Sequence, residues 1–169
     1  TIVNNSKEKK LAKCLHIPVI SELFSKVKGS LVNYYNKQNI TSIVFEGGAI
    51  GDPASINNHE AGIWELLINN NFINESDIPK RVEKNLADMK SFSSKIKGNY
   101  SVKYIHKIND EDHFIMHPNI RNFEKVEKNQ IIAEDKNGPI KSPITGYILM
   151  PLYQEQGNEG FYIIENEKA

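Results

Sequence analysis

The stretch TSIVFEGGAIGDP, residues 41–53, decides how this sequence is interpreted. Thr41 to Phe45 is a short apolar run with β-branched side chains, which predicts a buried strand. The run ends in a carboxylate, Glu46, and the next two residues are Gly47 and Gly48. This order places a carboxylate at the C-terminal edge of a sheet, where open α/β sheets bind ligands. The glycines let the backbone turn and leave space for water or substrate beside a general base.

A simpler interpretation of Glu46 also fits the position. A glutamate at the end of a strand can cap a turn or bind an arginine, and most carboxylates are ordinary surface groups. The local pattern alone leaves both interpretations open.

The segments around this stretch alternate between strand and helix signals. We expect a short strand over residues 16–20 and a mostly helical stretch over residues 21–38, broken near Gly29. A further helix is expected to begin at an N-cap at Ser55 and to end in the asparagines at 69–71. This alternation predicts part of an α/β sheet in which residues 41–46 are a central strand.

The pattern changes near residue 97. Residues 80–96 carry an apolar residue at every third or fourth position, which predicts a helix with one buried face. From Asn99 onward, turn signals recur about every ten residues between apolar runs, which predicts an antiparallel β unit. We therefore expect an α/β fold in two parts, an α/β portion over residues 1–97 and a compact all-β unit over residues 98–169.

The composition excludes several classes of protein. Of the 169 residues, 39% are hydrophobic and 25% are charged, which is typical of a globular protein. The 21 basic residues balance 21 acidic ones, so no net charge recruits nucleic acid or an anionic membrane. No apolar run approaches about 18 residues and no signal peptide is visible, so we expect a cytoplasmic protein. The single cysteine, Cys14, excludes an internal disulfide, and a homo-oligomer remains open.

Three stretches resemble a known family. VFEGGAIGDPASINNHEAGIWELL, residues 44–67, resembles the sequence around the catalytic glutamate of the succinylglutamate desuccinylase and aspartoacylase family. This family is the deacylase branch of the zinc carboxypeptidase-like hydrolases. LHIPVI, residues 15–20, is similar to a preceding part of the family, and NFEKVEKNQIIAEDKNGPIKSPITGYILMP, residues 122–151, to its C-terminal β unit. The resemblance covers most of residues 11–165.

The resemblance implies a partial zinc-carboxypeptidase-like fold and a mononuclear zinc hydrolase of amide or ester bonds. In such enzymes zinc lowers the pKa of its bound water, and a glutamate takes the proton and later delivers it to the leaving group. Glu46 matches that glutamate, so Gly47 and Gly48 are expected to keep the approach to it clear. The implied substrate is an N-acylated small molecule, from which a carboxylate is released.

The resemblance does not extend to the metal ligands. The family holds zinc with a His-x-x-Glu pair and a later histidine, all upstream of the catalytic glutamate. His16 is the only histidine upstream of Glu46 here, and no His-x-x-Glu pair precedes it. The substrate-binding arginines have no counterpart either, because Arg81 and Arg121 both lie downstream. We therefore expect this chain to be the C-terminal part of a deacylase, with the zinc ligands outside it and no activity on its own.

The other histidines form weaker patterns. His59-Glu60 has isoleucine at the position four residues after His59, so it is not a zincin motif, and His59 is expected on a helix surface. His113 and His117 lie four residues apart, with His106 nearby. On a strand that spacing spans about 13 Å, too far for one ion, so scattered surface histidines are expected.

Two alternatives to the deacylase remain. Lys136 precedes Asn137-Gly138 and the sequence SPITG at residues 142–146, a combination reminiscent of biotinyl and lipoyl carrier domains. Asn-Gly is also a common hairpin turn, so Lys136 is expected to be an ordinary turn residue. The second alternative is a non-enzymatic, β-rich binding or assembly module.

Overall fold

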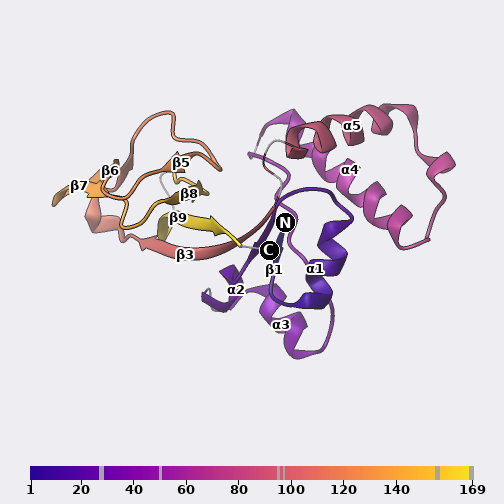
Figure 1. Ribbon diagram of the computed structural model, residues 1–169, viewed down its shortest axis with the longest axis horizontal. Helices are drawn as coiled ribbons and strands as arrows, with labels where there is room; N and C mark the ends of the chain where they lie inside the picture. Colours follow the sequence, from indigo (N-terminus) through magenta and orange to yellow (C-terminus); the bar gives the residue numbers. More distant parts are fainter. Residues whose placement is uncertain (27–28, 50, 95, 97, 155–156, 168–169) are drawn as a thin grey trace. The chain divides into compact units, whose positions relative to one another are not determined.

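The computed structural model describes residues 1–26, 29–49, 51–94, 96, 98–154 and 157–167 (Figure 1). The chain divides into two compact units, Thr1–Tyr100 and Ser101–Ala169. Residue 97, where the sequence predicts a boundary, lies outside the described residues. In the described part of the chain, no helix combines the length and the apolar character that crossing a membrane requires.

The first unit contains short strands and several helices. In chain order these are β1 (Ile2–Val3), α1 (Ser6–Lys13), β2 (Val19–Ser21), α2 (Leu23–Lys26), α3 (Leu31–Lys37), α4 (Pro53–Asn69), the 3-10 turn η1 (Glu75–Asp77) and α5 (Lys80–Ser94). β1 pairs with β2 in parallel, with Ile2 opposite Ile20. The predicted break near Gly29 is confirmed, because it lies between α2 and α3 with φ of +80°, a conformation that favours glycine.

Residues 41–46 do not form the predicted central strand. Val44 makes an isolated antiparallel bridge with Ile2, in which the two residues exchange N–H···O bonds of 2.8 and 3.1 Å. The prediction of a strand here was wrong, because the two-residue β1 offers this segment only one pair of ladder hydrogen bonds. Side-chain packing holds the segment instead. Ile43 packs against Val3 and Val19, which belong to a small buried cluster.

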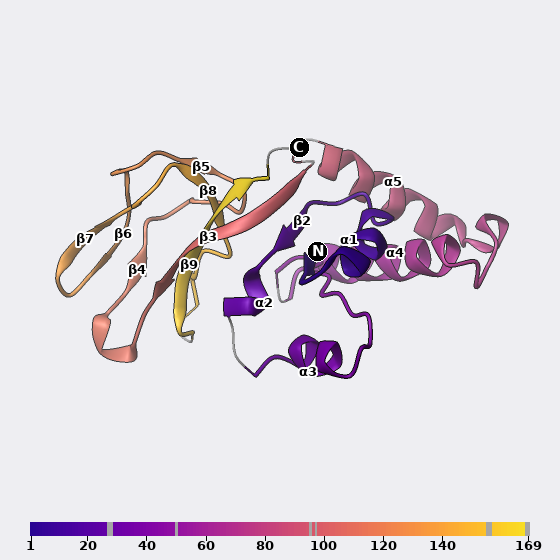
Figure 2. The same cartoon turned by 60° about the horizontal axis from the view of Figure 1, so that its bottom comes forward.

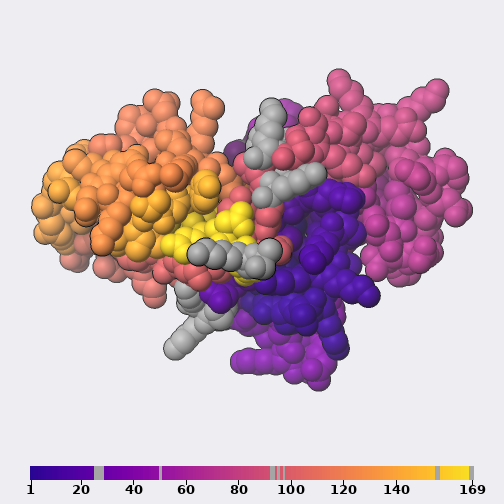
Figure 3. Space-filling model, in the orientation of Figure 1, coloured from indigo at the N-terminus to yellow at the C-terminus, as the bar shows by residue number. Residues whose placement is uncertain are grey.

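Helices α4 and α5 lie side by side and run in opposite directions (Figures 1 and 2). In the space-filling view, the magenta and rose atoms of this part of the chain lie next to one another (Figure 3). Ala61 of α4 is fully buried against Val82, Leu86 and Met89 of α5. The buried apolar face predicted for the helix over residues 80–96 is therefore confirmed for Val82, Leu86 and Met89 of α5.

The start of α4 differs from the prediction. Asp52 is the N-cap, and its side chain accepts a hydrogen bond of 2.9 Å from the Ala54 amide. Pro53 occupies the first turn, where its missing N–H costs nothing. This pairing of cap and proline starts the helix three residues earlier than the predicted cap at Ser55. The predicted end in the asparagine cluster is confirmed, since Asn70 is the C-cap.

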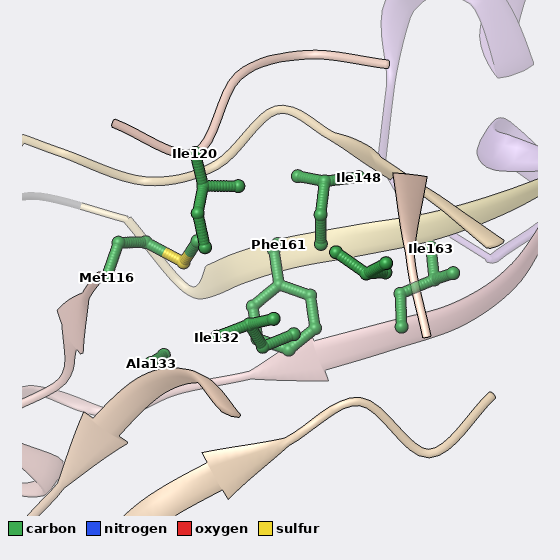
Figure 4. Packing of buried hydrophobic residues seen from close by; sticks show 8 residues of the cluster. Met116, Ile120, Ile132, Ala133, Ile148, Phe161 and Ile163 are labelled. Atoms are coloured by element: carbon green, nitrogen blue, oxygen red, sulfur yellow. The ribbon is translucent and has the colours of Figure 1, made fainter. Parts of the chain in front are cut away.

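The second unit is built from strands, as predicted. β3 (Asn99–Lys107) begins in the first unit. The elements that follow it are the 3-10 turn η2 (Asp110–Asp112), β4 (Ile115–Met116), β5 (Lys125–Val126), β6 (Ile131–Asp135), β7 (Gly138–Lys141), β8 (Gly146–Leu149) and β9 (Glu159–Asn166). Residues 120–150, all of them described, contain no helix. Phe161 is fully buried at the centre of the core, among Ile132, Ile148, Ile163 and Met116 (Figure 4).

The strands form a mixed six-stranded sheet with the order β1-β2-β3-β9-β8-β5 and an antiparallel three-stranded sheet with the order β4-β6-β7. β8 pairs antiparallel with β9 and with β5. The predicted fold class, an α/β portion followed by a β unit, is confirmed.

Candidate active site

Glu46 lies between the bridge residue Val44 and the start of α4, and its side chain is exposed. Val44, two residues before Glu46, makes its backbone bridge with Ile2 of β1. Glu46 is therefore a solvent-accessible carboxylate beside the first strand of the sheet.

Helix α4 packs directly on the turn that carries Glu46. The Nδ2 group of Asn58 donates a hydrogen bond of 2.7 Å to the carbonyl of Gly47. A Cβ atom added to Gly47 would lie 2.4 Å from both Cε1 and Nδ1 of His59. Gly47 is buried, so a glycine is needed here for close approach to the helix. Whether the glycines also clear a path to Glu46, as the sequence suggests, stays a prediction.

The His59 ring is fixed by two further contacts. Its Nδ1 atom lies 2.7 Å from the carbonyl oxygen of Ser55, one turn earlier in α4. Because a carbonyl can only accept a hydrogen bond, Nδ1 must carry the proton in this arrangement. The ring also makes an edge-to-face contact with Phe45, with ring centroids 5.3 Å apart. His59 is thus on the helix surface, as predicted, but it contacts both neighbours of Glu46.

Two small residues bring helix and turn together. Gly62 of α4 is buried, and a Cβ atom there would lie 3.1 Å from Cε1 of Phe45. Gly48 has φ of +139°, in the region that favours glycine, and a Cβ atom there would lie 3.3 Å from Cβ of Ser55. At positions 48 and 62, the missing side chains therefore let the turn and the helix approach each other closely.

The described residues of this chain do not fit a zinc site. Among them, no three His, Cys, Asp or Glu side chains lie close enough to hold one ion. The upstream histidine, His16, instead lies with its Nε2 3.6 Å from Oε1 of Glu65. Glu65 is almost fully buried and also pairs with Lys90 Nζ at 3.0 Å and Asn69 Nδ2 at 3.2 Å. Its carboxylate is already used in an ionic cluster that connects α4 with α5.

The three histidines of the β unit do not come together. His106 is half-buried and stacks on Phe161, with ring centroids 4.9 Å apart and ring planes 1° apart. Burial lowers the pKa of His106, while the charges of Asp135 and Asp112 oppose the shift. The prediction of a surface histidine was wrong for His106, because its ring belongs to the aromatic cluster around Phe161.

His113 and His117 lie in the connections on either side of β4 (Ile115–Met116). His113 is exposed and has φ of +53°, directly after η2. The amide of His117 donates to the Ile132 carbonyl at 3.0 Å, and its own carbonyl accepts a 2.7 Å hydrogen bond from the Tyr153 hydroxyl.

Lys136 lies in the turn between β6 and β7. Its Nζ is 3.1 Å from Oδ1 of Asp112, and its amide donates to the Asp112 carbonyl at 2.8 Å. This side chain therefore pairs with a neighbouring turn in the same unit.

Comparisons with known proteins identify similar solved structures. No family model matches the sequence. No curated protein matches it either. A succinylglutamate desuccinylase from Vibrio cholerae aligns with a TM-score of 0.35 and 16% identity, over 54% of this chain and 30% of that chain. A second, described as a succinylglutamate desuccinalase from Vibrio parahaemolyticus, aligns with a TM-score of 0.49 and 12% identity, over 98% of this chain and 47% of that chain.

Both solved structures carry the name of the enzyme family that the sequence stretches resemble. The finding is one of similarity between this chain and these two solved chains. The chain spans less than half the length of either solved chain.

The sequence pattern did not predict the contacts of Asn58 and His59 with the Glu46 turn. Ser55, Asn58, His59 and Gly62 are three, four and seven residues apart, which places them on one face of a helix. This mix of small and polar residues at helical spacing, just after a Glu-Gly-Gly turn, was the available signal.

Proposed function

We propose that this chain is the C-terminal part of a zinc-dependent deacylase. The complete protein would hydrolyse an amide or ester bond of an N-acylated small molecule, and Glu46 would act as general base and then general acid. One observation carries the proposal. The glutamate that the family resemblance marks as catalytic is an exposed carboxylate on a turn whose backbone is fastened to α4.

The proposed role of Glu46 is proton transfer. Its carboxylate accepts a proton from the attacking water while the water oxygen bonds to the acyl carbon. The same proton is then delivered to the leaving nitrogen or oxygen as the acyl bond breaks, so the proton count is balanced. An exposed side chain suits this role, because a general base must be reached by water and substrate. The mobility of its turn is limited by the Asn58 hydrogen bond and by the His59 ring.

Zinc is the proposed cofactor of the complete protein, with its ligands in residues outside this chain. The described side chains of residues 1–169 do not fit a zinc site. It follows from the proposal that residues 1–169 alone neither bind zinc at the active site nor hydrolyse substrate.

The test is a comparison of the complete protein with residues 1–169. Both are incubated with a panel of N-acyl amino acids, released carboxylate is measured, and the zinc content of each is determined. The proposal expects zinc and hydrolysis in the complete protein only. A complete protein without zinc and without hydrolysis would favour the non-enzymatic module instead.

A further inference from the structure

The turn that carries Glu46 is fastened to α4 at its peptide groups. The carbonyl of Gly47, the residue next to Glu46, accepts the 2.7 Å hydrogen bond from Asn58 Nδ2. That carbonyl belongs to the Gly47–Gly48 peptide, the second peptide group after Glu46. A glycine pair has unusual backbone freedom, so an external contact is needed to keep one conformation.

The His59 ring also packs against this turn. It lies where a side chain at position 47 would be, with Cε1 and Nδ1 2.4 Å from the position of a Cβ atom. Its Nδ1 hydrogen bond to Ser55 and its edge contact with Phe45 hold the ring in place. Phe45 and Gly47, the two neighbours of Glu46, are thus contacted by one imidazole.

We infer that Asn58 and His59 are positioning residues for Glu46. This inference rests on the proposed function of Glu46 as the base. Neither side chain needs to touch substrate. Asn58 fixes the plane of the Gly47–Gly48 peptide, one residue beyond Glu46, and His59 fills the space next to Gly47. Together they keep the carboxylate in one direction, and small misplacements of a reacting group are costly to rate.

The experiment compares Asn58→Ala and Asn58→Asp in the complete protein, with Asn57→Ala as the matched control. Asn57 is the preceding residue in the same helix and is exposed. Asn58→Asp keeps the side-chain size but replaces the donor with an acceptor that faces a carbonyl. We expect kcat to fall about 10-fold in Asn58→Ala and further in Asn58→Asp. KM and zinc content are expected to stay unchanged, a split that a general loss of structure would not produce.

Amide hydrogen exchange of the segment 44–49 gives a second measurement that does not depend on activity. Faster exchange in Asn58→Ala, but not in Asn57→Ala, is the expected result. Unchanged kcat and unchanged exchange in Asn58→Ala, while Glu46→Gln is inactive, would overturn the positioning inference and leave the proposed function intact. Full activity in Glu46→Gln would overturn both.

Discussion

Replacing Gly47 with alanine tests the packing between the Glu46 turn and α4. The added methyl group would lie 2.4 Å from two ring atoms of His59, well inside van der Waals contact, so the ring must move. His59 is on the surface and can turn outward, but it would then lose its Nδ1 hydrogen bond to Ser55 and its edge contact with Phe45. A hydrogen bond contributes about 1 kcal/mol and an aromatic pair about 0.5–1.5 kcal/mol. We therefore expect Gly47→Ala to lower the free energy of unfolding by about 1–3 kcal/mol.

The assay is urea unfolding of residues 1–169, followed by circular dichroism, for Gly47→Ala, His59→Ala and the double variant. Once the ring is absent, the added methyl group has no ring to displace, so the double variant should be no less stable than His59→Ala alone. Gly51→Ala is the control, because its φ of +84° strains an alanine while a Cβ atom there meets nothing within 4 Å. Its cost should be unchanged by His59→Ala. Strictly additive effects of Gly47→Ala and His59→Ala would refute the packing argument.

Three further predictions concern other parts of the chain. Lys90→Met removes the lysine partner of the buried Glu65 carboxylate, so urea unfolding should show a free energy of unfolding lower by about 1–3 kcal/mol. The loss should be smaller than for a fully buried ion pair, because the Lys90 side chain is half-exposed. Burial lowers the pKa of His106 in the folded state, so the unfolded state binds a proton at this residue more readily than the folded state. The free energy of unfolding should therefore decrease as the pH falls from the ordinary histidine pKa of about 6.5 toward the lowered value. His106→Phe keeps an aromatic ring on Phe161 and should weaken the pH dependence of the melting temperature between about pH 5 and 8. An unchanged pH dependence in this variant would show that other titratable groups cause it. Intact mass of the native protein should match the unmodified sequence, and an added biotin or lipoate on Lys136 would instead support a carrier domain.

Much of the fold follows from periodic apolar patterns. The helix over residues 80–94 and the β unit were predictable because their buried faces repeat at helical or strand spacing and turn residues separate them. Residues 41–46 have the same apolar pattern but form only one bridge, to Ile2. A strand depends on the length of its partner, and no local pattern reports that length. The early start of α4 shows a different limit, since Ser55 and Asp52 are both good caps and only the proline after Asp52 distinguishes them.

The candidate site was predicted only in part. Glu46, Gly47 and Gly48 were chosen from local sequence and family resemblance, and Glu46 is accessible as a base must be. Asn58 and His59 act through contacts with residues eleven or more positions earlier, which sequence spacing alone did not reveal. His106 was misassigned to the surface because its stacking partner, Phe161, is distant in sequence.

The most direct test of the central claim is the activity of Glu46→Gln in the complete protein. Glutamine has nearly the same shape as glutamate but cannot accept the proton, and proton transfer by a positioned base contributes roughly 10² to 10⁴ in rate. Deacylation of a panel of N-acyl amino acids and zinc content are measured together for wild type and variant. We predict an intact fold, unchanged zinc and a rate reduced by roughly that factor. Equal activity in both proteins would contradict the assignment of Glu46 as the base, and loss of zinc in the variant would make it a metal ligand instead.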